Sequence, residues 1–306
     1  MVIVVEPTIA NVINAVFSSF LVVGLLTSPQ EFMKGGKYLS EWFSNLPEET
    51  NSYIYYMGQI CSLVMLSTFV IPVIIAPSSQ FLCYISTIMH GFMLVHFQFF
   101  IFGFGSYNLV KPTTMSGKIQ WWFMFFSVMG LFVLSILASL HDGPTISLVS
   151  DYYNKDYLLA LFPVNVAVMV MSSIFSLAFV LVPTQIISTF WEDNQILPNI
   201  ICGFKQLQIN GIVNWFARIT GLAFLSTNLA TIFNPVDGVE NGLYHPLYSI
   251  IALLIMSLIN LFNFNVIIMR QYEGLSSYLL VVSWIPNIIL GGIFITLLTL
   301  TMVTRE

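Results

Sequence analysis

Charged residues are scarce in this chain: Asp, Glu, Lys and Arg together make up only 8% of its 306 residues. Ordinary soluble domains have about a quarter of their residues charged, so this composition excludes a typical water-soluble fold. The few basic residues form no stripe of the kind that contacts a nucleic-acid backbone, and the net charge is −5. We therefore expect no nucleic-acid partner.

Cysteine is also rare, and Cys61, Cys83 and Cys202 have no C-x-x-C spacing. An odd number of isolated cysteines indicates neither a disulfide framework nor a zinc site. The motifs that place a serine nucleophile, a zinc-binding His pair or a phosphate-binding lysine are absent too. The apolar stretches also lack the regular Asp or Glu residues of most ion-coupled pumps. We expect a chain with no enzymatic activity and no metal site.

Apolar residues dominate instead, at 57% of the chain, with a mean hydropathy of +0.87. A helix needs about 20 predominantly apolar residues to cross a hydrocarbon core about 30 Å thick. The sequence therefore predicts an all-α, polytopic membrane protein with eight transmembrane helices. Their expected ranges are 9–26, 57–76, 81–104, 121–140, 158–182, 212–233, 243–269 and 278–303.

The eight stretches form two similar sets of four. In each set a proline follows the first stretch. The second stretch of each set contains a similar run of residues, and a further proline follows that run. These runs are Ile60-x-x-Leu63-x-x-Leu66-Ser67-Thr68 before Pro77, and Ile219-x-x-Leu222-x-x-Leu225-Ser226-Thr227 before Pro235. We predict two tandem four-helix repeats in the same orientation, 1–145 and 158–306, joined by a linker at 146–157.

The basic residues predict the orientation in the membrane, because cytoplasmic connections are enriched in Lys and Arg. Seven of the nine fall on the side reached after the first, third, fifth and seventh helices. We expect both termini on the non-cytoplasmic side, or its equivalent in an organellar inner or thylakoid membrane. The opposite, termini-side connections are acidic, and we expect Asp237 and Glu240 to lie there in a solvated loop.

Two histidines, His90 and His96, lie within the third stretch. An imidazole in a bilayer can ligate the iron of a haem or the magnesium of a chlorophyll, or it can hydrogen-bond to a neighbouring helix. Six residues rotate about 600° along an α-helix, so the two side chains are expected to point in different directions and not to share one metal. They are the candidate cofactor-binding residues.

Polar side chains on the sixth and seventh stretches are the second candidate site. Arg218 is the only charged residue inside a predicted span, while Asn260 and Asn263 share one helix face and Asn228 lies on the preceding span. Such residues could line a path for a polar solute, or they could join helices by hydrogen bonds. Both interpretations stay open at this point.

The function that best fits this composition is a non-catalytic accessory or scaffold subunit of a larger respiratory or photosynthetic type of membrane complex. Its 27 Phe and 14 Met residues would pack against lipids, pigments or other integral membrane subunits. No cofactor is required, and lipid, haem or chlorophyll are the ligands considered. The alternatives are a carrier or channel for a small polar solute and a haem- or chlorophyll-binding membrane subunit.

Overall fold

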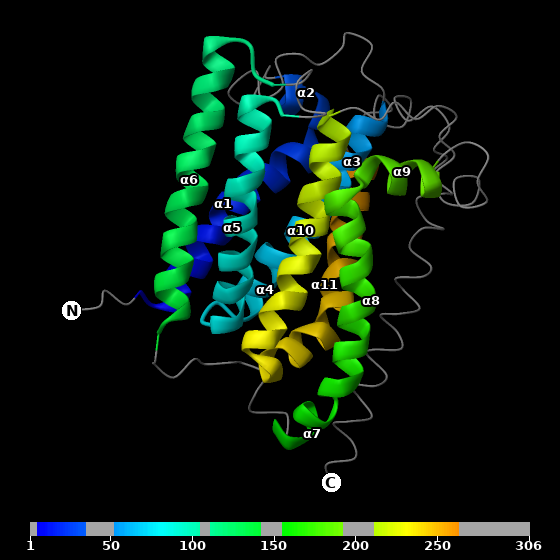
Figure 1. The fold of residues 1–306 in the computed structure, drawn as a ribbon. Coiled ribbons are helices and arrows are strands. Elements are labelled where there is room, and N and C mark those ends of the chain that lie inside the picture. The colour runs from blue at the N-terminus through cyan, green and yellow to red at the C-terminus, as the bar shows by residue number, and fades with distance from the viewer. Residues whose placement is uncertain (1–4, 35–51, 105–110, 142–154, 192–210, 263–306) are drawn as a thin grey trace.

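The structure is a computed structural model that describes residues 5–34, 52–104, 111–141, 155–191 and 211–262. Within these ranges the chain forms helices joined by turns and contains no strand (Figure 1). The helices are α1 (Pro7–Thr27), α2 (Pro29–Lys34), α3 (Ser52–Met65), the π-helical turn η1 (Leu66–Val70), α4 (Ile71–Ile75), α5 (Gln80–Phe102), α6 (Met115–Ser139), α7 (Lys155–Ala160), α8 (Phe162–Leu181), α9 (Pro183–Trp191), α10 (Gly211–Phe233) and α11 (Pro235–Phe262).

Five segments of the described chain are long and apolar enough to cross a membrane: α1, the continuous segment Met57–Ile75, α5, α6 and α10. Shorter apolar stretches occur in α8, over Asn165–Leu181, and in α11, over Leu247–Met256. The protein is therefore an all-helical, membrane-embedded protein, as the composition predicted. The predicted eighth helix, 278–303, lies outside the described residues.

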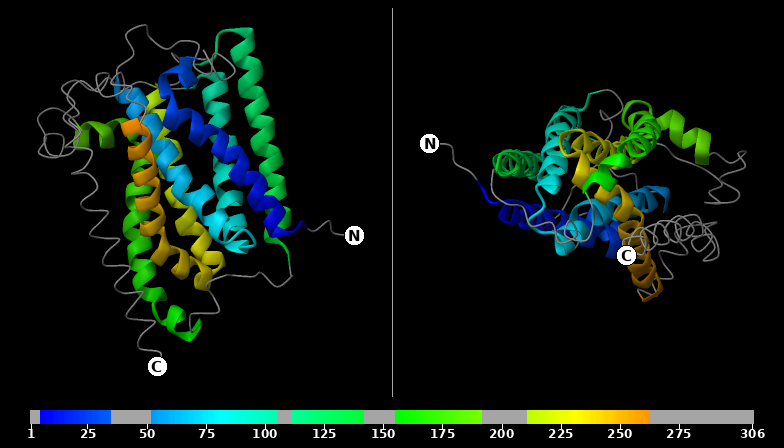
Figure 2. Two further views of the ribbon diagram at one scale, coloured as in Figure 1. Left: turned by 180° about the vertical axis from the view of Figure 1, so that it is seen from behind. Right: turned by 90° about the horizontal axis from the view of Figure 1, so that it is seen from below.

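Helix α10 lies in the middle of the bundle, where it packs against α3, α5, α8 and α11. Helix α6 lies at one edge and packs against α5 and α1 (Figures 1 and 2). In Figure 1, α1, α5, α8 and α11 run upward, whereas α3, α6 and α10 run downward. The long helices therefore alternate in direction along the chain, as expected when short connections join membrane helices.

The start of α11 differs from the sequence-based expectation. The helix begins at Pro235 rather than at residue 243, so Asp237 and Glu240 are helical and not in a loop. The Asn234 side chain caps this end: its Oδ1 accepts from the Asp237 N–H at 3.4 Å, and its Nδ2 donates to the Asp237 carboxylate at 2.6 Å. Proline is tolerated in a first turn, and the Asn234 side chain satisfies one of the free backbone N–H groups there, that of Asp237.

Two other expected helices are interrupted. The fifth, predicted as 158–182, is divided at Leu161 into α7 and α8, with Pro163 in the first turn of α8. The second, predicted as 57–76, contains η1 just before Pro72. A proline cannot donate to the carbonyl four residues earlier, here that of Thr68, and a π-helical turn accommodates the lost bond.

Aromatic side chains fill the upper centre of the bundle. Trp215 of α10 lies 5.6 Å from Trp121 and 5.3 Å from Phe216 between ring centroids. Phe97 and Phe100 of α5 lie 6.1 and 6.0 Å from the same indole. We call these five residues the aromatic cluster. All five are less than 9% exposed, so α5, α6 and α10 meet in a closely packed apolar core.

Candidate functional site

The two candidate histidines both lie on α5 and are buried, with His90 6% and His96 7% exposed. His96 stacks on Trp215, with ring centroids 6.1 Å apart and an angle of 18° between the planes. Nδ1 of His90 has no hydrogen-bond partner within the described residues. Among those residues, no three His, Cys, Asp or Glu side chains come close enough together to hold a metal ion. His96 therefore extends the aromatic cluster of α5, α6 and α10.

Arg218 lies on α10, one turn beyond Trp215, and is half-buried. Its guanidinium is within electrostatic range of His96. The residue belongs to the upper half of α10 in Figure 1, the end at which most of the described Lys residues also lie. Arg218 and His96 are thus brought together beside the aromatic cluster, a pairing that sequence spacing alone did not predict.

Asn228 joins two helices. Its Nδ2 donates to Ser172 Oγ at 2.8 Å and to Ser173 Oγ at 3.0 Å, both on α8. Asn228 is near the lower end of α10, whereas Asn260 is near the upper end of α11, and Asn263 lies outside the described residues. The hydrogen bonds of Asn228 thus link α10 to α8.

Other amide side chains on the long helices also form links between elements. A buried amide without a partner would be costly in a bilayer, so such bonds stabilise the bundle. The bonds run from Asn11 Nδ2 to the carbonyls of Pro77 and Ser79 at 2.8 Å, from Asn14 Nδ2 to Ser135 Oγ at 3.0 Å, from Gln59 Nε2 to the Leu26 carbonyl at 3.3 Å, from Gln80 Nε2 to the Ser139 and His141 carbonyls at 2.8 and 2.9 Å, and from Asn214 Nδ2 to Thr184 Oγ1 at 3.1 Å.

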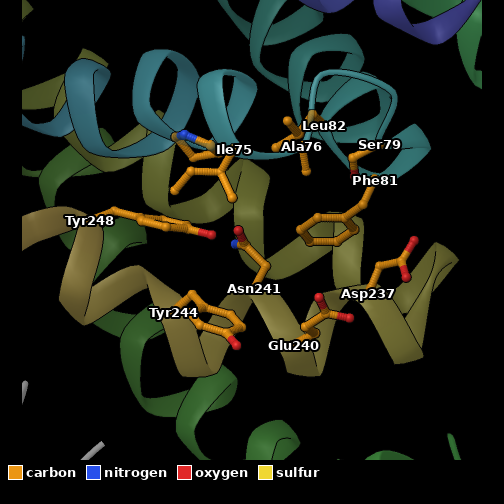
Figure 3. Close-up of a pocket in the computed structure, with 11 residues that line it drawn as sticks. Ile75, Ala76, Ser79, Phe81, Leu82, Asp237, Glu240, Asn241, Tyr244 and Tyr248 are labelled. Carbon is orange, nitrogen blue, oxygen red and sulfur yellow. The ribbon is translucent and has the colours of Figure 1, made fainter. Parts of the chain in front are cut away.

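A separate pocket of about 40 Å³ lies at the lower end of the bundle, between the α4–α5 turn and the first four turns of α11 (Figure 3). We call it the lower pocket. Its polar side chains come mainly from α11 and include both Asp237 and Glu240. Sequence reasoning missed this pocket because it placed these acids in a loop. The Asn234-Pro235 cap preceding them was the available signal for an earlier helix start.

Comparison with known proteins adds no assignment. No protein-family model, curated protein or solved structure matches the chain. The function is therefore argued from packing, polar contacts and the lower pocket.

Proposed function

We propose that this protein is a non-catalytic accessory or scaffold subunit of a larger membrane complex, where it packs against other integral subunits and lipids. The observation that carries this proposal is the use of the intramembrane polar groups. The described amides that make hydrogen bonds inside the bundle tie helices together, and the aromatic cluster fills the space between α5, α6 and α10. This construction favours a rigid body over a solute pathway.

Cavity sizes support the same interpretation. An apolar cavity of about 20 Å³ lies between α1, α3, α5 and α10, with Trp215 and Phe216 in its wall. The lower pocket has about 40 Å³. A single water needs roughly 10–15 Å³ on this measure, so each cavity holds one to a few waters at most. Neither is large enough for a polar metabolite, and Asn228, one member of the expected path, is bonded to α8.

The outer surface fits contact with lipids, pigments or other subunits. Only 28% of the most apolar stretch of α6 is buried, against 78% of the segment Met57–Ile75. Trp122 and Phe126 stack on this outward face, with centroids 6.0 Å apart. The exposed apolar side chains of α6 include Met115, Ile119, Trp122, Phe123, Phe126, Met129 and Val133. Large, polarisable side chains of this kind suit both acyl chains and pigment rings.

We retain two tandem four-helix repeats, 1–145 and 158–306, with a linker at 146–157, as the proposed architecture. In support, α1 and α8 run in the same direction, as do α3 and α10, and α5 and α11 (Figure 1). Cys61 and Thr220, which occupy equivalent positions in the matching runs, make a side-chain hydrogen bond. Such self-contact of equivalent positions is expected near a two-fold axis along the membrane normal.

The proposed orientation places both termini on the non-cytoplasmic side. Lys34, Lys111 and Lys118 lie at the upper end of the bundle, whereas Lys155 is at the lower end (Figure 1). A membrane-impermeant maleimide tests this orientation with a single cysteine introduced at Glu6 or at Lys118. Labelling from the non-cytoplasmic face is expected only at position 6, and the reverse pattern would contradict the orientation.

The scaffold proposal is tested by purifying the full chain from its native membrane in a gentle detergent. Native mass and the absorption spectrum are then measured on the same fraction. A defined assembly larger than a monomer or dimer, with other membrane subunits, is the expected result. A small, colourless particle would contradict the proposal and direct attention to solute flux in vesicles. A visible band carried by the chain alone and lost in His90→Leu would instead identify a haem- or chlorophyll-binding subunit.

A further inference from the structure

The carboxyl end of α5 turns back on itself and presents phenylalanine rings beside α6. Gly103 ends α5 in a left-handed conformation, with φ 69°. Its N–H bonds to the Phe100 carbonyl at 3.2 Å, and the N–H of Phe104 bonds to the Phe99 carbonyl at 3.0 Å. This pair of bonds is a Schellman motif, which brings the residue after the glycine back onto the last turn of the helix. Phe104 accordingly packs against Phe99, with ring centroids 5.9 Å apart.

Phe102 joins this turn to α6. Its ring centroid lies 6.1 Å from those of Phe104 and Trp122, and Trp122 in turn stacks on Phe126 at 6.0 Å. We call Phe99, Phe102, Phe104, Trp122 and Phe126 the outer aromatic surface. Each of the five is between 37% and 57% exposed, so this surface faces away from the bundle. It is separate from the buried aromatic cluster between α5, α6 and α10.

Lys118 lies where this surface reaches the boundary of the membrane. Helix α6 begins at Met115, ahead of the stretch 121–140 that is long enough to cross the hydrocarbon core. A rise of about 1.5 Å per residue places Lys118 roughly one turn outside that core, in the head-group layer. Trp122 follows Lys118 after four residues and Phe126 follows after four more, so the exposed lysine and the two rings share one side of the helix.

The charge at this end of α5 and α6 is positive. Between residues 50 and 141 the sequence has no Asp or Glu, and Lys111 and Lys118 are its only Lys or Arg residues. Helix α6 lies at the edge of the bundle and packs mainly against α5 and α1 (Figures 1 and 2). The acidic residue of these elements is Glu6, which precedes α1 at the opposite end of the bundle. The upper end of this edge is therefore complementary to an anion.

The outward face of α6 is better suited to lipid than to another helix. Closely packed helix pairs in membranes use small residues or hydrogen bonds between helices. From Ile119 onward the exposed residues of α6 are large, apart from Gly130. Ser127 and Ser139 donate to carbonyls of α6 itself, at 2.9 and 2.8 Å, and Ser135 is bonded to α1. The hydroxyls of this segment are thus used within the bundle.

We propose that Lys118 and the outer aromatic surface bind an anionic phospholipid. The Lys118 ammonium donates to the phosphate of the head group, and an acyl chain lies along Trp122 and Phe126. This inference rests on the proposed contact of α6 with lipids and deepens it by naming the charge of the head group; it requires no other subunit. In the proposed orientation the upper end faces the cytoplasmic leaflet or its organellar equivalent, whose surface is negatively charged.

The test measures the fluorescence of Trp122 in the full chain, reconstituted into phosphatidylcholine bilayers. Part of the lipid is replaced by phosphatidylglycerol or by phosphatidylcholine with brominated acyl chains, which quench tryptophan on contact. Subtracting the quenching seen in Trp122→Phe isolates the signal of Trp122 from those of the other tryptophans. We expect brominated phosphatidylglycerol to be preferred about fivefold over brominated phosphatidylcholine, the effect expected of one lysine near an anionic head group.

Charge variants then assign the preference to one side chain. Lys118→Gln, measured with and without Trp122→Phe, should abolish the preference, whereas Lys118→Arg keeps the charge and should retain it. Lys155→Gln removes a lysine from α7 at the lower end and is the matched control, so it should leave the preference unchanged. Far-ultraviolet circular dichroism checks that each variant is folded.

Four results would overturn the proposal. Equal quenching of the wild type by both brominated lipids would exclude selection of the head group, and an undiminished preference in Lys118→Gln would exclude this lysine. Absence of quenching by either lipid would show that a second copy of the chain, and not lipid, covers the outer aromatic surface. Loss of the preference on adding glycerol phosphate, beyond the effect of NaCl at the same ionic strength, would identify a soluble phosphate as the ligand. Because only the isolated chain is used, failure to co-purify with other subunits would contradict the scaffold proposal alone.

Discussion

Gly221 lies where α10 passes close to α8, and substitution by alanine tests the packing of these helices. A Cβ atom added at Gly221 would be 2.7 Å from the Ser176 carbonyl oxygen and 2.9 Å from Phe179 Cβ. The first contact is with backbone, which cannot rotate away, so the two helices must separate. Overpacking of this kind costs about 1–3 kcal/mol of unfolding free energy.

Gly130 on α6 is the matched control for this substitution. A Cβ added there has no described neighbour within 4 Å. Both substitutions gain the same helix propensity, up to about 1 kcal/mol, so the difference between them isolates the steric contact. We expect Gly221→Ala to be about 1–3 kcal/mol less stable than Gly130→Ala.

The assay is reversible unfolding in mixed micelles of a mild detergent and sodium dodecyl sulfate, followed by far-ultraviolet circular dichroism. Gly130→Ala should be as stable as the wild type or slightly more stable. Equal stability of the two variants, within about 0.5 kcal/mol, would refute the close approach of α8 and α10 at Gly221.

Three further substitutions or modifications test other parts of the bundle. Trp215→Ala removes the central ring of the aromatic cluster and should cost about 3–5 kcal/mol in the same assay, whereas the more exposed Phe224→Ala should cost clearly less. Asn228→Leu removes two hydrogen bonds to α8 and should cost about 1 kcal/mol; an unchanged stability would argue against a structural role for this amide. Cys61 and Cys83 are at most 1% exposed, so N-ethylmaleimide should modify neither until the chain is unfolded, as counted by mass spectrometry in a chain whose third cysteine is replaced by serine. Rapid modification in the folded state would contradict their burial.

The positions of most long helices follow from the sequence. In a bilayer a spanning segment must satisfy its own backbone and must be apolar over its whole length, which leaves a clear record in hydropathy. The helix predicted at 212–233 is observed as Gly211–Phe233, and that predicted at 81–104 as Gln80–Phe102. Prolines at the turns, such as Pro29 and Pro235, also mark real boundaries.

Helix continuity was predicted less well. Pro72 and Pro163 both lie within apolar runs, and hydropathy does not register the lost N–H that produces η1 and the break before α8. The start of α11 was misplaced for the opposite reason: Asp237 and Glu240 are polar, and polarity was taken to indicate a loop. The local cap at Asn234 carried the correct signal but is a weaker feature than a run of charge.

The sequence by itself determined that the protein is helical and lies in a membrane, because composition and run length suffice for that conclusion. Only the tertiary structure decided which polar groups meet. Lipid-facing and protein-facing residues are similarly apolar in a bilayer, so helix faces leave little pattern in the sequence. It was the packing of α10 against α8 that paired Asn228 with two serines, and the packing of α11 against the α4–α5 turn that enclosed Asp237 and Glu240 in a pocket.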